Sequence, residues 1–159
     1  MEKIRWCTKL GDGIRLDEPN ENLCRAYVKK AEKSLQATSS LKENREWAIS
    51  TSYYSMYFAL YSILVRIGIK CEVHSCTIEF MKRFLSEYFT KEECKFLEKA
   101  MKARIDVQYY VDRTVSDEQY RKMLEEAPLF LVKCKGVLSK IGEREVMNIR
   151  KEIKKLIGI

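Results

Sequence analysis

The sequence predicts an all-α fold: an antiparallel up-and-down bundle of about five to six helices with a short N-terminal arm or hairpin. Apolar residues recur at spacings of three and four along most of the chain. Only six Gly and two Pro occur among 159 residues, which leaves few turn signals for a many-stranded β fold. A charge-free segment, residues 47–65, needs neighbours to cover it. This length suits one compact domain, so we expect a single helical domain over 1–159.

The N-terminal segment, residues 1–18, alternates apolar and polar positions on either side of a Gly-Asp-Gly turn. This pattern is compatible with a small hairpin or with an extended arm packed on the helices. Pro19 and Asn20 then begin a helix that runs to about Thr38. Its apolar stripe consists of Leu23, Ala26, Tyr27, Ala31 and Leu35.

The charge-free segment, residues 47–65, predicts the central helix of the bundle. On a helix its residues form three neighbouring seams with alternating spacings of four and three. The small seam is Ala48, Ser52, Ser55, Ala59 and Ser62. The bulky seam is Ile49, Tyr53, Met56, Leu60, Ile63 and Ile67, and the aromatic seam is Trp47, Thr51, Tyr54, Phe58, Tyr61 and Val65. A helix that is apolar on every side should contact partners on every side.

A bilayer span is the alternative for these nineteen residues, because their length would suffice. Four Ser, one Thr and four Tyr lie among them, and the chain has no second apolar span. We therefore expect no membrane association.

After Gly68 the sequence predicts a loop that holds Cys71, His74 and Cys76, then a short helix. Thr90 followed by Glu93 is a capping box and begins a helix to about Asp112. Its buried stripe is Phe96, Leu97, Ala100, Ala103, Val107 and Val111, and Arg104 falls within it.

The last third of the chain predicts two more helices. Ser116 or Asp117 begins the first of them, Pro128 should kink it, and Gly142 ends it. A basic amphipathic helix, residues 143–159, follows.

Composition favours a cytoplasmic protein with reduced thiols. Six cysteines are scattered without a Cys-x-x-Cys pair, and the N-terminal residues contain no apolar stretch of signal-peptide length. Nineteen Lys and eighteen Glu against a single His are typical of a thermophile, whose intracellular proteins sometimes do contain disulfides. The net charge of +7 permits an RNA, nucleotide or acidic-protein partner.

A possible metal site is the group Cys71, His74 and Cys76, whose side chains zinc accepts as ligands. A structural zinc normally needs four ligands, and no paired cysteine nearby supplies the last. We expect two ordinary thiols and one His instead, and no metal or cofactor. A disulfide between Cys71 and Cys76, or to another cysteine, is an equally open alternative.

His74 is the single histidine, so any Ser-His-Asp or Cys-His catalytic group would have to use it. No nucleophile elbow, phosphate loop or dinucleotide fingerprint occurs in the sequence. In a loop before a helix, His74 is expected to be a structural or capping residue.

Arg104 is the most informative charged residue, because its guanidinium lies on an otherwise apolar stripe. A buried, unpaired arginine is unfavourable, so it needs a carboxylate, backbone carbonyls, a phosphate or a cleft open to water. Asp106 and Asp112 are candidate partners. A structural ion pair and a functional site explain the residue equally well.

From about Glu18 to Ile141 the sequence resembles the HEPN family (higher eukaryotes and prokaryotes nucleotide-binding). The order and spacing of several short motifs carry this resemblance. They are Glu18-Pro19 with Tyr27, Ala31 and Leu35; Ala48 followed by Tyr53-Tyr54-Ser55-Met56-Tyr57; His74-Ser75 before Phe80; and Arg104 with Asp106 and Tyr109 or Tyr110.

The resemblance implies a helical bundle that forms a homodimer, pairs with a minimal nucleotidyltransferase and often belongs to a toxin–antitoxin system. Active members cleave RNA without metal through an Arg followed four to six residues later by a His. The Arg stabilises charge at the phosphate and the His acts as acid or base. Here those spacings reach Tyr109, Tyr110 and Val111, and no His follows. Tyrosine, with an ordinary pKa near 10, is a poor base at neutral pH.

We therefore expect a protein with weak or no catalysis that binds a nucleotidyltransferase partner, a nucleotide or RNA in a groove around Arg104. The expected catalytic residues are Arg104, Asp106 and Tyr109, and the expected ligand-binding residues are Arg104, Tyr109, Tyr110 and His74. An RNA-cleaving toxin that uses Arg104 is the first alternative, and a purely structural interaction subunit is the second.

Overall fold

The computed structural model describes residues 2–158. Within them seven helices surround one minimal two-stranded sheet, which confirms the all-α class and exceeds the predicted helix number. The elements are α1 (Glu2–Lys9), β1 (Arg15–Leu16), α2 (Glu21–Ser40), α3 (Arg45–Ile67), β2 (Ile69–Lys70), α4 (His74–Phe84), α5 (Lys91–Tyr109), α6 (Asp117–Lys140) and α7 (Glu143–Ile157). Among the helices of this described part, none has both the length and the hydropathy to cross a bilayer.

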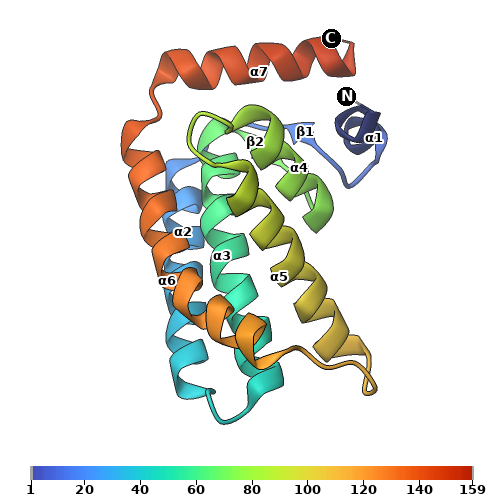
Figure 1. Cartoon of the computed structure of the whole chain (residues 1–159). Coiled ribbons are helices and arrows are strands. Elements are labelled where there is room, and N and C mark those ends of the chain that lie inside the picture. Colours follow the sequence, from blue (N-terminus) through green and yellow to red (C-terminus); the bar gives the residue numbers. More distant parts are fainter. Residues whose placement is uncertain (1, 159) are drawn as a thin grey trace.

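The predicted central helix is α3, which runs through the middle of the bundle with α2, α5 and α6 packed around it (Figure 1). Every member of the small seam is fully buried, from Ala48 to Ser62. Ser52 and Ser62 donate to backbone carbonyls of their own helix, so these buried hydroxyls keep a hydrogen bond. Small side chains let α2 and α6 approach α3 closely.

The aromatic seam of α3 is covered less completely than expected. Trp47 is 57% exposed, and Tyr54 and Phe58 are only partly buried. The expectation that α3 has partners on every side is wrong at this seam. Two cations lie over its rings instead: the Lys30 ammonium over Phe58 and the Arg104 guanidinium over Tyr54.

The N-terminal arm or hairpin was the wrong prediction for most of residues 1–18, because Glu2–Lys9 form helix α1. Ile4 and Cys7, three residues apart, are buried, while Trp6 is 50% exposed. The buried positions thus follow the helical period and not the alternating one. Only the segment after the glycines is extended: β1 pairs antiparallel with β2, Arg15 opposite Lys70.

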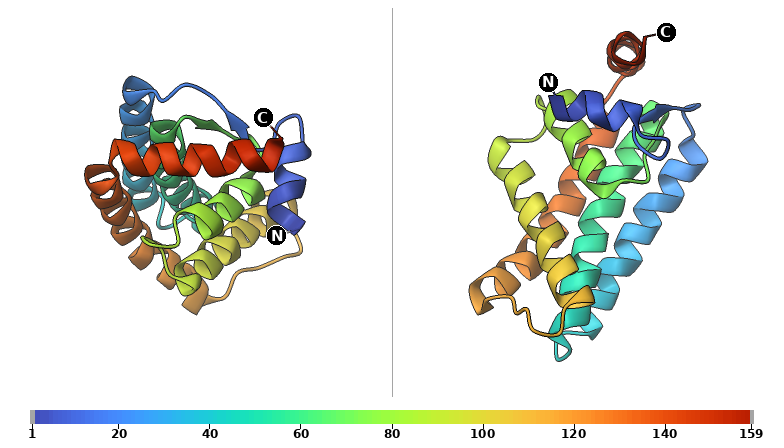
Figure 2. Two further views of the ribbon diagram at one scale, coloured as in Figure 1. Left: turned by 90° about the horizontal axis from the view of Figure 1, so that it is seen from above. Right: turned by 90° about the vertical axis from the view of Figure 1, so that its right-hand side faces the viewer.

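Helix α7 lies across one end of the bundle, beside α1, and crosses the axes of the long helices (Figures 1 and 2). Arg150 fastens it there: its Nη1 donates to the carbonyl oxygens of Asp17, Ile67 and Gly68 at 2.7–3.0 Å. These groups lie at the C-terminal end of α3, where carbonyls lack helical partners and a cation is favourable. Gly68 ends α3 with φ +80°, and a Cβ there would lie 2.2 Å from Arg150 Nη1.

The second half follows the prediction with shifted boundaries. The Thr90–Glu93 capping box is present, and Ser116 caps α6. Pro128 lies inside α6, which changes direction along its length in Figure 1. Two boundaries were wrong: α5 ends at Tyr109, before Asp112, and α4 begins at His74, which was expected in a loop.

Candidate anion-binding site

Arg104 occupies the buried stripe of α5 as predicted and is 7% exposed. No carboxylate within residues 2–158 lies at ion-pair distance from it, so neither Asp106 nor Asp112 is its partner. The side chain is instead held by neutral groups. Its Nη1 donates to Gln108 Oε1 at 3.3 Å, and its Nε, although buried, has no hydrogen-bond partner among the described residues.

Two tyrosines of α3 form the wall against which Arg104 packs. The guanidinium carbon lies 5.2 Å from the ring centre of Tyr53 and 5.5 Å from that of Tyr54. Such contacts stabilise a cation modestly and do not neutralise its charge. Gln108 is exposed, so its bond to Nη1 places that edge of the guanidinium at the rim of the protein surface.

His74 comes to the same place from the first turn of α4. Its Nδ1 lies 2.8 Å from the hydroxyl oxygen of Tyr53. Its ring stacks on that of Tyr57, with centroids 3.9 Å apart and an angle of 8° between the planes. No described residue hydrogen-bonds Nε2, so His74 is held on one side and has a free nitrogen on the other. We call Arg104, Gln108, His74, Tyr53, Tyr54 and Tyr57 the Arg104–His74 site.

Burial and charge keep this site uncharged except for the arginine. Burial, followed by the positive charge of Arg104, lowers the pKa of His74 to about 4, so the imidazole is neutral at pH 7. Burial also raises the pKa values of Tyr53 and Tyr57 well above the ordinary 10, and both keep their protons. The site therefore combines one fixed positive charge with neutral hydrogen-bonding groups.

The tautomer of His74 decides what its free nitrogen does. When the Tyr53 hydroxyl donates to Nδ1, the imidazole carries its proton on Nε2, which can donate to an anion. When Nδ1–H donates to the Tyr53 oxygen, Nε2 has a free lone pair and can accept a proton. The first arrangement suits binding and the second suits base catalysis.

Asp106 lies in a separate ion cluster. Its carboxylate accepts from Lys102 Nζ at 3.0 Å and from Arg113 Nη1 at 2.8 Å. The hydrogen bond from Arg113, followed by that from Lys102, lowers the pKa of this carboxyl. Asp106 is thus ionised and already paired, and it ties the end of α5 to the loop that follows.

The two other expected residues, Tyr109 and Tyr110, point toward solvent. They are 66% and 43% exposed, and Tyr110 stacks under Arg113, whose guanidinium carbon lies 3.6 Å from the ring centre. No hydrogen bond, ion pair or ring contact between described residues joins either tyrosine to Arg104. The structure brings His74 to Arg104 and leaves these two tyrosines at the end of α5.

The suspected zinc ligands do not form a metal cluster. Cys76 is disulfide-bonded to Cys7, with Cα atoms 5.6 Å apart, so it is no thiolate ligand. Cys71 is a buried free thiol whose Sγ contacts the Val73 carbonyl. In the described residues, no three His, Cys, Asp or Glu side chains are placed to share a metal ion. The expectation of fully reduced thiols is wrong for the Cys7–Cys76 pair.

Sequence reasoning did not assign Tyr53, Tyr57 and Gln108 to the site. A signal existed for each of them. Tyr53 and Tyr57 are four residues apart and so share one face of α3, and Gln108 is four residues after Arg104 on α5. What the sequence lacked was any sign that α4 begins at His74 and places it on that face.

A larger hollow lies on another flank of α5, between α5 and the start of α6. Its volume is about 480 Å³, and its lining includes Lys99, Lys102, Asp106 and Lys122 but not Arg104. The expected open groove around Arg104 is therefore a narrow, largely closed site.

Comparison with known proteins agrees with this architecture. The HEPN domain profile matches residues 24–137. A UPF0332 protein of Archaeoglobus fulgidus is 28% identical over 116 residues, which cover 71% of this chain and 93% of that protein. A protein of Methanocaldococcus jannaschii named "Putative toxin" is 29% identical over 115 residues, or 70% of this chain and 78% of the relative. Since the profile spans most of the chain, from α2 to α6, this protein belongs to the HEPN domain family.

Proposed function

We propose that this protein is a toxin-like HEPN protein whose Arg104–His74 site binds a phosphate group of RNA or of a nucleotide, with weak or no cleavage. One observation carries the proposal: a guanidinium that is 7% exposed has no carboxylate partner among the described residues and an unpartnered Nε. Since a buried, uncompensated charge is costly, its retention is explained best by an anion that pairs with it. The toxin name of one relative supports the same class.

A phosphate suits the surroundings better than a carboxylate side chain of this chain would. The guanidinium offers planar N–H donors, and the neutral His74 can add an Nε2–H donor. Gln108 at the rim can move from Nη1 to the ligand, because their 3.3 Å hydrogen bond is long.

Weak cleavage follows from the state of the possible bases. His74 has a pKa of about 4, so it is a much weaker proton acceptor than a histidine poised near pH 7. Tyr53 and Tyr57 keep their protons. A well-tuned general base contributes about 10²–10⁴ in rate, and this chain lacks one on α5.

The second candidate is a metal-independent, RNA-cleaving toxin. The closeness of His74 to Arg104 favours it, because a neutral imidazole with a free nitrogen lies next to a cation that can stabilise a phosphate. A homodimer and a minimal nucleotidyltransferase partner belong to both candidates, and the family resemblance supports them.

The deciding experiment incubates the protein with a labelled single-stranded RNA in the presence of a chelator and measures binding by fluorescence anisotropy and cleavage on gels. We expect binding that is lost in Arg104→Ala and kept in the matched control Arg121→Ala, whose side chain is 73% exposed. Efficient cleavage that both Arg104→Ala and His74→Ala abolish would establish the second candidate. Binding unaffected by Arg104→Ala would refute the site.

A further inference from the structure

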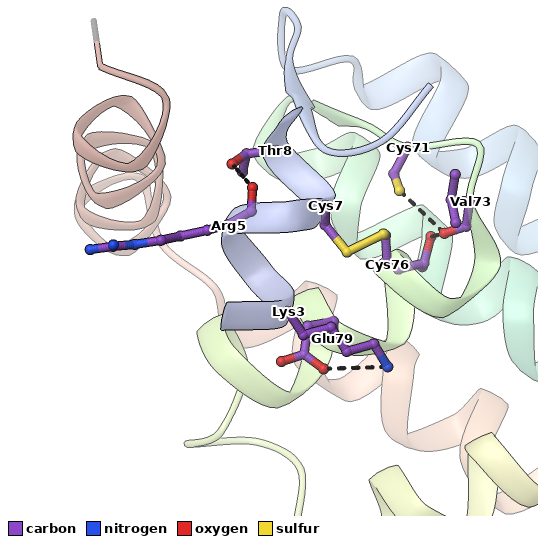
Figure 3. Close-up of a disulfide and its surroundings, with 9 residues drawn as sticks. Lys3, Arg5, Cys7, Thr8, Cys71, Val73, Cys76 and Glu79 are labelled. Carbon is purple, nitrogen blue, oxygen red and sulfur yellow. Dashed lines mark hydrogen bonds and ion pairs between the residues drawn. A yellow bond between two sulfur atoms is a disulfide. The ribbon is translucent and has the colours of Figure 1, made fainter. Parts of the chain in front are cut away.

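The N-terminal helix α1 is joined covalently to the helix that carries His74. The Cys7–Cys76 disulfide links positions 69 residues apart in sequence (Figure 3). Cys7 lies outside the region that matches the HEPN profile, whereas Cys76 lies inside it. The link therefore ties an added segment to the common domain.

The geometry of α4 places this link next to the site. His74 and Cys76 both lie in the first turn of α4 and are two residues apart, about 200° around a helix. One side of the turn thus faces α3, where His74 contacts Tyr53 and Tyr57. The other side faces α1, where Cys76 bonds to Cys7.

The first turn of α4 has few other restraints. Its N-cap residue, Val73, supplies no side-chain hydrogen bond, and only one ion pair, Lys3 with Glu79 at 3.8 Å, joins α1 to α4. That pair lies at the surface, where such contacts contribute little. Helix α1 has eight residues, too few to be stable without tertiary contacts.

We infer that the Cys7–Cys76 disulfide is a positioning element of the Arg104–His74 site, because it clamps the first turn of α4 and thereby holds His74 against Tyr53 and Tyr57, beside Arg104. This inference rests on the proposed function for its consequence in ligand binding. When a small dithiol reduces the bond, two electrons and two protons convert it to two thiols, and the dithiol becomes a disulfide. The turn then frays, and His74 leaves its two tyrosines.

His74 itself reports on the clamp. It is the single histidine of the chain, so its ring signals in an NMR spectrum need no assignment. Its low pKa arises from burial and from Arg104, and Tyr53, Tyr54 and Tyr57 are the other titratable groups in contact with its ring. A frayed turn exposes the ring and moves its pKa from about 4 toward the ordinary 6.5.

The experiment compares the oxidised protein, the same protein reduced with dithiothreitol, and Cys7→Ser. Cys24→Ser, which changes a buried free thiol on α2, is the matched control. Histidine NMR titrations and anisotropy with a labelled single-stranded RNA are recorded on each, and circular dichroism verifies that the bundle stays folded. In reduced protein and Cys7→Ser we expect the higher pKa of His74 and RNA binding weakened about three- to tenfold, the equivalent of one lost hydrogen bond. The control should keep both values.

The outcomes separate this inference from the proposed function. An unchanged His74 pKa in folded, reduced protein would overturn the inference and leave a bond that only stabilises α1. If Cys7→Ser does not fold, reduction of the native protein supplies the same comparison. If the oxidised protein binds no RNA, the proposed function fails, while the NMR titration still decides whether the disulfide positions His74.

Discussion

Replacing Arg104 with methionine separates a functional arginine from a structural one. Methionine has a similar length, fits irregular apolar surroundings and carries no charge. If Arg104 were an element of stability, its loss would destabilise the fold. If it is kept for an anion, the unliganded protein should be more stable without it, and ligand binding should disappear.

The structure sets the expected magnitude. The substitution removes two cation–π contacts of about 0.5–1 kcal/mol each, to Tyr53 and Tyr54, and one long hydrogen bond to Gln108 of about 1 kcal/mol. It also removes a buried, unpartnered Nε that costs about 1–3 kcal/mol and the several kcal/mol needed to bury an unpaired cation. We expect a net stabilisation of about 1–2 kcal/mol.

Urea denaturation of Arg104→Met beside the unchanged protein measures this difference, and a thermal melt should rise by about 2–4 °C per kcal/mol for a chain of this size. Arg104→Lys is the matched control, because it keeps the charge and should show no such gain. Destabilisation of Arg104→Met by more than about 1 kcal/mol would refute the reasoning and make Arg104 a structural residue.

Three further predictions concern acid stability, helix termination and assembly. Because the pKa of His74 is about 4 in the folded state and ordinary in the unfolded chain, the unfolded chain takes up the proton first. Stability should therefore fall from pH 6.5 to pH 4, by about 2 kcal/mol after allowance for partial exposure, and urea titrations of His74→Phe should lack this component. Gly68→Ala places a Cβ against Arg150 at φ +80° and should destabilise by about 1–3 kcal/mol in the same assay, whereas Gly136→Ala, in open space inside α6, should stabilise by up to about 1 kcal/mol. Light scattering should give a homodimer, twice 18.8 kDa, and a monomer mass at micromolar concentrations would contradict this.

Patterns within one helix predicted the fold well. The absence of charge from 47 to 65 identified α3, and the Thr90–Glu93 box located the start of α5, because both signals are local. The prediction failed at α1, where eight residues offer about two turns. Ile4 with Trp6 fits alternation as well as Ile4 with Cys7 fits a helix, and burial alone decides between them.

The site was only half predictable, for a physical reason. The apolar stripe of α5 showed that Arg104 would be buried, but partners on other helices depend on how those helices pack. Asp106 was a reasonable candidate two residues away, yet it lies about 200° around the helix and bonds Lys102 and Arg113. The Cys7–Cys76 bond joins residues 69 positions apart, and spacing alone could not select it from six cysteines.

A single histidine also limits the chemistry that this chain can perform on RNA. On an ideal helix, Tyr109 lies about 140° from Arg104, so a side chain at that position leaves the face on which the arginine sits. His74 reaches that face from α4 and brings one imidazole nitrogen to it, since the other is used by Tyr53. Breaking an RNA strand requires a proton to leave the attacking hydroxyl and another to reach the departing oxygen. One nitrogen with a pKa of about 4 performs the first step poorly and leaves the second to water, whereas donation from Nε2 to a bound phosphate needs no proton transfer. Binding is therefore the task for which this arrangement is better suited.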